Sequence, residues 1–101
     1  MIEKIYDNME SYLNKFFPYI EFEGELYHNS FMFTSDRYEV MVVYHNEHQF
    51  YGILIRRYKK DIYVNRLPNP AVIEETMRVL ASCSDIKTKE RDYKIDQMLK
   101  D

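Results

Sequence analysis

The chain has 101 residues, of which 46% are hydrophobic and 31% charged, and its formal net charge is −3 at pH 7. This length predicts one domain, spanning residues 1–101, with one small core. The composition excludes a disordered chain, and no apolar run approaches the roughly 20 residues that cross a bilayer. The N-terminus is acidic and lacks the apolar stretch of a signal peptide, so we expect a cytoplasmic protein without a membrane role. The wealth of Tyr, Ile, Lys and Asn is typical of AT-rich bacterial or phage genomes.

Residues 2–17 carry the clearest helical pattern. Apolar side chains recur there at spacings of three and four, which places them on one face of a helix. They are Ile2, Ile5, Tyr6, Met9, Tyr12, Leu13, Phe16 and Phe17. Pro18 ends the pattern, because the residue before a proline avoids the helical conformation. This stripe predicts packing against a sheet, or a stripe shared with a second copy or a partner.

Strand-forming residues dominate from residue 20 to residue 67. The segment 20–34 reads either as one bent strand or as a short hairpin, with Gly24 marking a turn or bulge. Two strands follow, Glu39–Tyr44 and Phe50–Arg57, folded back on each other across residues 45–48. Met41 and Val43 alternate with Val40, Val42 and Tyr44, so apolar side chains point to both faces. This pattern indicates a strand in the centre of a sheet.

The last third of the chain is predicted to be helical. A short strand, Ile62–Arg66, precedes a helix for which Asn69 is the expected N-cap and Pro70 the first residue. Residues 82–85 interrupt the helix, and Ser84 or Asp85 can cap another. The segment 86–101 forms helices readily but is weakly amphipathic, so both a docked and a frayed helix remain open.

These elements predict an α+β fold. It consists of an N-terminal helix, an antiparallel meander of four or five strands and one or two C-terminal helices. The helices are expected to cover one face of the sheet, while the other face is exposed or used in a homodimer.

Residue patterns that carry catalytic chemistry are weak in this sequence. His45 and His48 lie in an expected hairpin turn, without the H-E-x-x-H spacing of a helical zinc site, so exposed turn histidines are the favoured interpretation. Cys83 is the only cysteine, which excludes an internal disulfide and fits a reducing compartment. Two glycines cannot build a glycine-rich phosphate loop. We therefore expect no enzyme, cofactor or metal, and a metal protein or enzyme built on His45 and His48 is the second alternative.

A compact basic stretch contrasts with an acidic first half. Residues 1–55 hold nine acidic against three basic residues, whereas residues 56–60 hold four basic residues and no acid. Those four are Arg56, Arg57, Lys59 and Lys60. They would contact phosphates in a nucleic-acid-binding module, which is the first alternative function. A solvated strand end is the simpler interpretation, because the acidic surroundings weaken attraction to a polyanion.

Acidic and tyrosine residues carry the leading functional hypothesis. Acidic side chains alternate from residue 21 to residue 25, and ten tyrosines are too many for so small a core to bury. The candidate partner-binding residues are Glu21, Glu23, Glu25, Tyr27, Tyr38, Tyr44 and Tyr51. The sequence thus favours a non-enzymatic module that sequesters or inhibits another protein. A mobile-element inhibitor, an immunity protein and a small chaperone all fit, and the partner's identity stays open.

Overall fold

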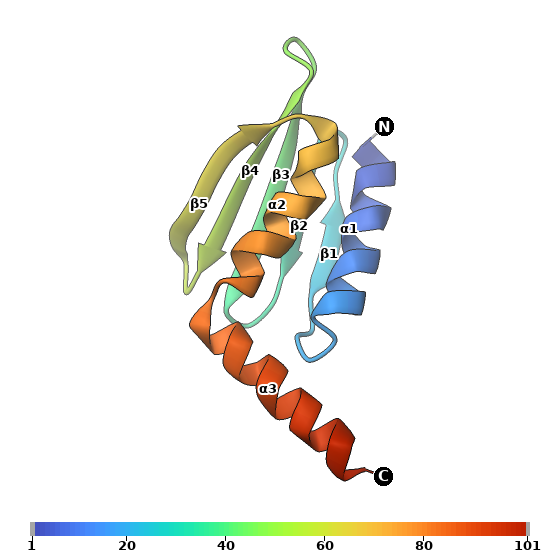
Figure 1. Ribbon diagram of the computed structural model, residues 1–101. Coiled ribbons are helices and arrows are strands. Elements are labelled where there is room, and N and C mark those ends of the chain that lie inside the picture. Colours follow the sequence, from blue (N-terminus) through green and yellow to red (C-terminus); the bar gives the residue numbers. More distant parts are fainter. Residues whose placement is uncertain (1, 101) are drawn as a thin grey trace.

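The structure is a computed structural model that describes residues 2–100, and its fold is α+β as the sequence predicts (Figure 1). A helix at the N-terminus precedes five strands, and two helices follow the sheet. In chain order the elements are α1 (Ile2–Phe16), β1 (Glu23–Leu26), β2 (Ser30–Thr34), β3 (Tyr38–His45), β4 (Phe50–Arg57), β5 (Lys60–Leu67), α2 (Asn69–Ala81) and α3 (Ser84–Leu99).

The five strands form one antiparallel meander in the order β1-β2-β3-β4-β5. The segment left open by the sequence is a hairpin, since β1 pairs with β2 through Glu23 opposite Thr34 and Leu26 opposite Phe31. β3 is the central strand, as its apolar residues on both faces indicate. A tight turn joins β4 to β5, with Tyr58 and Lys59 at φ values of 52° and 63°. This left-handed backbone suits the two-residue turns of hairpins.

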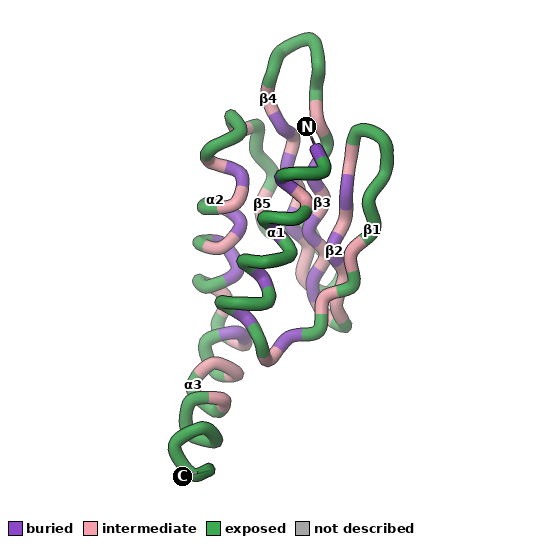
Figure 2. Tube along the Cα trace, turned by 90° about the vertical axis from the view of Figure 1, so that its right-hand side faces the viewer, coloured by how far each residue is buried: buried purple, intermediate pink, exposed green. Residues whose placement is uncertain are grey.

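Two helices cover one face of the sheet and leave the other bare (Figures 1 and 2). α1 packs against β1 and β2, α2 packs against β4 and β5, and the two helices contact each other. The residues that face this layer form a single hydrophobic core. Its most deeply buried members are Met9, Leu13, Phe31, Phe33, Val40, Val42, Tyr51, Ile55, Val72, Leu80 and Ile86. We call the face of the sheet that α1 and α2 cover the inner face, and the opposite side the outer face.

Several predicted boundaries differ from the structure by a few residues. Asn69 is not an N-cap: the cap position is Pro68, no side chain caps the helix, and Pro70 lies in its first turn. Cys83, rather than Ser84 or Asp85, precedes α3. β5 is longer than predicted because its pairing with β4 continues past a bulge down to Lys60. Pairing with a neighbour extends a strand beyond what local propensity suggests.

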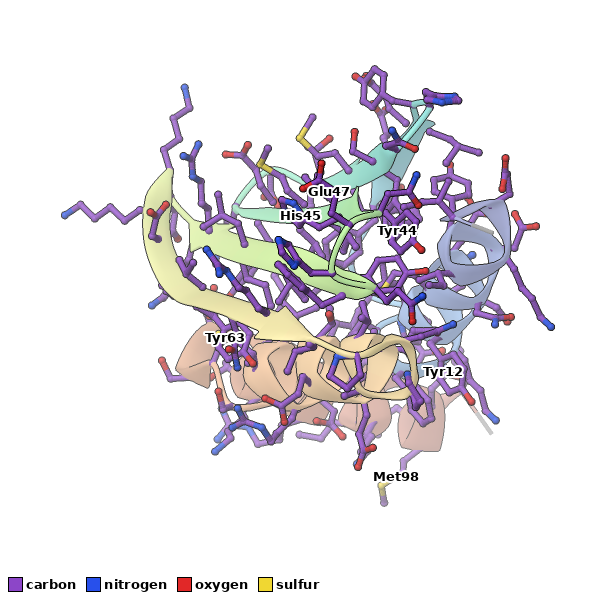
Figure 3. The ribbon with its side chains drawn as sticks, turned by 90° about the horizontal axis from the view of Figure 1, so that it is seen from above. Tyr12, Tyr44, His45, Glu47, Tyr63 and Met98 are labelled. Atoms are coloured by element: carbon purple, nitrogen blue, oxygen red, sulfur yellow. The ribbon has the colours of Figure 1, made fainter. Side chains whose placement is uncertain are left out.

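α3 contacts the domain from its first turn to Tyr93, whose ring centroid lies 5.6 Å from that of Tyr19, and its last residues are exposed. Ile86 is buried, whereas Ile95, Met98 and Leu99 are 46%, 77% and 78% exposed. The helix runs away from the sheet along the long axis of the molecule (Figure 1). The Met98 side chain projects away from the domain (Figure 3). Within the segment 86–101, residues 86–99 therefore form one helix, whose first part is docked on the domain and whose last residues are exposed. Residue 101 lies outside the described part.

Candidate functional site

The structure divides the seven candidate partner-binding residues into two groups. Glu21, Glu23, Glu25 and Tyr27 are exposed at one edge of the sheet. Tyr38 and Tyr51 instead lie in the core, with 2% and 1% exposure, and Tyr44 is half-buried with its ring 4.9 Å from that of Tyr51. The expectation that these tyrosines share one exposed surface is corrected for Tyr38 and Tyr51, because both sit at inward positions of β3 and β4.

The exposed group forms an acidic edge, which we define as Glu21, Glu23, Glu25 and Tyr27. β1 is an outermost strand, so one of its sides has no neighbouring strand. The Tyr27 hydroxyl donates a hydrogen bond to Glu25, and this bond, with the nearby carboxylate charge, raises the pKa of Tyr27. Glu21 and Glu23 also line a hollow of about 600 Å³ together with Asp36 and Lys89. The carboxylates therefore gather on one accessible surface.

Gly24 explains how this edge stays close to the helical layer. A β-carbon at Gly24 would lie 2.3 Å from the Tyr6 hydroxyl and 2.6 Å from the Phe33 ring. The Tyr6 ring stacks on Phe33 at a centroid distance of 4.9 Å. Only glycine lets the β1 backbone approach this aromatic pair. The same residue thus seats β1 on α1 and turns the neighbouring acidic side chains outward.

The outer face carries an apolar row instead of the polar surface usual for a bare antiparallel sheet. Directly paired residues form this row from β2 to β5: Met32, Met41, Leu54 and Val64. Val43 and Ile62 extend it, with 40% and 41% exposure, and Val64 is 69% exposed. Charged residues flank the row at Glu39, Arg56 and Arg66.

A hollow interrupts the outer face where Gly52 has no side chain. It measures about 580 Å³, and Met41, Val43, Leu54 and Val64 are among its lining residues. Its rim is held in place by ring contacts, since Phe50 stacks on His45 at 4.8 Å and lies 5.3 Å from the Arg66 guanidinium. The outer face therefore offers an apolar depression beside an apolar ridge.

Asp85 is the centre of a polar cluster that joins α3 to the sheet. The Tyr38 hydroxyl donates a hydrogen bond to its carboxylate, and the guanidinium groups of Arg57 and Arg37 lie 3.5 and 3.6 Å away. Burial alone would raise the pKa of Asp85, but the Tyr38 hydroxyl, Arg57 and the backbone N–H groups of Asp85 and Ile86 together hold it below its ordinary value. Burial, followed by the bond to Asp85, raises the pKa of Tyr38. This cluster fastens the first turn of α3 to β3 and β4.

The basic stretch is split by the pleat of β4. Arg56 points to the outer face, where its Nε donates a 2.8 Å hydrogen bond to Asp61. Arg57 points to the inner side and pairs with Asp85, and its guanidinium lies 5.3 Å from the Tyr58 ring. Lys59 and Lys60 are exposed at the turn. The four cations thus do not converge on one groove for a phosphate backbone.

Two imidazole rings at the β3–β4 turn stack on one phenyl group. His45 and His48 stack on Phe50 at 4.8 and 5.6 Å. Figure 3 labels His45, the last residue of β3, and Glu47, which lies in the β3–β4 loop. Across residues 2–100, no group of three or more His, Cys, Asp or Glu side chains is arranged to hold a metal ion.

Two features of the surface escaped the sequence reasoning. The Asp85 cluster joins residues 47 positions apart, and no local pattern announces such a pair. The continuous outer row was only partly visible, through Met41 and Val43 on the second face of β3. The matching outward positions of β2, β4 and β5 could have been found by continuing the same alternation once the register was known.

Comparisons with known proteins identify no relative of this chain. No protein-family model, curated protein or solved structure matches the chain. Between residues 2 and 100, no helix has both the length and the apolar character needed to span a bilayer.

Proposed function

We propose that the protein is a non-enzymatic binding module that sequesters or inhibits a basic partner protein through its acidic edge. The observation that carries this proposal is the exposure of the acidic edge, in which Glu23 and Glu25 lie on the outermost strand β1 and Glu21 and Tyr27 lie just before and after it. Carboxylates on an accessible surface steer a cationic partner toward it. Tyr27 supplies a rigid contact surface, with 52% of its area exposed.

The edge position of β1 favours an extended segment of the partner. An outermost strand presents unpaired backbone groups, and an added strand can satisfy them. Glu23 and Glu25 point to the outer face, where they would meet basic side chains of that segment. The neighbouring Leu26 is 42% exposed and adds apolar contact.

The experiment first isolates the partner by native capture from the source organism's lysate, with and without nuclease. The captured protein is then purified and titrated calorimetrically against three forms of the chain. The forms are the native chain, a Glu23→Ala/Tyr27→Ala variant, and a control Glu74→Ala/Tyr12→Ala variant. The control removes an exposed acid and a 43% exposed tyrosine from the helical side.

We expect the first variant to weaken binding at least about 10-fold and the control to leave it unchanged. Binding by the native chain should also weaken as salt is raised, because exposed charges are screened. Full affinity in the correctly folded Glu23→Ala/Tyr27→Ala variant would reject the acidic edge. Capture that disappears with nuclease would instead favour a nucleic-acid-binding module.

A further inference from the structure

We propose that the outer face of the sheet is a homodimer interface, in which two copies pack their sheets face to face. This interface is distinct from the acidic edge. It rests on three properties of the outer face: an apolar centre, a depression beside a ridge, and charges of opposite sign at matching positions. Together these properties make the face complementary to a second copy of itself, which is what a two-fold interface requires.

The apolar centre departs from the usual alternation of a half-exposed sheet. Met41, Val43 and Leu54 point outward from the two central strands, while Val42 and Ile53 point inward. A bare sheet in water normally carries polar residues on its outward positions. Contiguous apolar surface of this kind marks an interaction site.

The register of β3 and β4 defines where a second copy fits. Four outward pairs stand opposite each other on these strands: Glu39 with Arg56, Met41 with Leu54, Val43 with Gly52, and His45 with Phe50. A two-fold axis that runs parallel to the strands, between β3 and β4, lays β3 of one copy over β4 of the other. Each of the four pairs is then also made between the copies, and each is made twice.

These intermolecular pairs are chemically matched. Val43, which is 40% exposed, would enter the hollow of about 580 Å³ above the partner's Gly52. Met41 would pack on the partner's Leu54, and Glu39 would face the partner's Arg56. Packed sheets lie about 10 Å apart with their side chains interdigitated, so a ridge opposite a depression is the required shape.

The size of the face bears on the strength of the dimer. Four strands of each copy, β2 to β5, overlap in this arrangement. At a spacing of about 4.8 Å they are about 19 Å wide, and eight residues at about 3.3 Å each are about 26 Å long. The flat area is therefore at most about 500 Å² per copy, below the roughly 800 Å² per partner of standard interfaces, so we expect a weak dimer that forms at high protein concentration. In this arrangement β1 lies beyond the partner's β5, so the acidic edge stays accessible in the dimer.

Sedimentation equilibrium of the full chain, at concentrations up to about 1 mM, tests this interface. We expect a species of twice the chain mass of 12.4 kDa. Val43→Lys should raise the dissociation constant at least about 100-fold, because it places a lysine in an apolar hollow on each side. Gly52→Leu should act similarly by filling the hollow. A control Met98→Lys/Leu99→Lys variant, altered on the exposed end of α3, should dimerise as the native chain does.

A charge-exchange cycle fixes the orientation of the two copies. Glu39→Arg alone and Arg56→Glu alone should each weaken the dimer, and the double variant should recover it, because the opposite charges are restored. Circular dichroism confirms that each variant is folded. A native chain that stays monomeric throughout, or a dimer that survives both Val43→Lys and Gly52→Leu, would overturn the proposal. If one of these two variants fails to fold, the other variant and the charge-exchange cycle still test the interface.

Discussion

The two faces of the sheet are built from the same strands but meet different surroundings. On the inner face α1 and α2 exclude water, and Val40, Val42 and Ile55 are fully buried. On the outer face Met41, Val43 and Leu54 have similar apolar side chains, yet they remain partly exposed. Neighbouring residues of one strand therefore differ in burial while their chemistry is alike. This contrast shows that the hydrophobicity of the side chains does not by itself predict which face of a central strand is covered by helices.

The contrast predicts unequal costs for truncating neighbouring residues. Phe31 is 1% exposed and contacts the Tyr6 and Phe33 rings at 5.6 and 5.7 Å, whereas Met32, the next residue, lies on the outer face. Phe31→Ala should lower the free energy of unfolding by about 3–5 kcal/mol, because it leaves a cavity in the core. Met32→Ala should lower it by less than about 1 kcal/mol in dilute solution. Urea denaturation of both variants measures the difference.

Equal losses for the two variants in dilute protein would contradict the difference between the two faces, since they would mean that the monomer covers its outer face as well. A loss for Met32→Ala that grows with protein concentration would show that the outer face is covered only in the dimer. Such growth is expected when a folded dimer adds to the stability of the monomer.

The two glycines extend the comparison to insertion of a side chain. Gly24 faces Tyr6 and Phe33 on the inner side, where an added β-carbon would lie 2.3 Å from the nearest atom. Gly52 opens to the outer face, where the nearest atom is the flexible His45 Nε2 at 3.2 Å. Gly24→Ala should destabilise the protein by about 1–3 kcal/mol, as overpacking does, and Gly52→Ala should change stability by less than about 1 kcal/mol. Thermal unfolding of both variants is the measurement, and a reversed order would contradict the assignment of the two faces.

The sequence predicts the fold more completely than the site, and the reason is the range of the interactions. The period of apolar residues in α1 and the alternation in β3 are local, so the helix and the central strand were predicted correctly. Whether Tyr38 and Tyr51 are exposed depends on which face the helices cover, and this is decided by contacts distant in sequence. The missing side-chain cap before α2 is a further case, because Asn69 has good capping propensity but begins the helix itself.

Adjacent arginines provide the last test of the two faces. Arg57 binds Asp85, whose side chain is 15% exposed, on the inner side, whereas Arg56 binds the 54% exposed Asp61 on the outer side. Asp85→Asn should lower the free energy of unfolding at neutral pH by about 1.5–3 kcal/mol, because charged hydrogen bonds are lost in a partly buried place. Asp61→Asn should cost less than about 1 kcal/mol, as exposed ion pairs do.

The pH dependence separates the electrostatic role of Asp85 from simple packing. Its pKa is held below the ordinary value in the folded protein. The ionised carboxylate therefore stabilises the fold fully above the unfolded-state pKa, and this stabilisation is lost as the pH falls through the lower folded-state pKa. The stability difference between the native chain and Asp85→Asn should thus be constant above about pH 5 and shrink in more acidic solution. Urea denaturation at a series of pH values measures this difference. A difference that stays constant at every acidic pH would show that Asp85 stabilises the attachment of α3 through packing rather than through its charge.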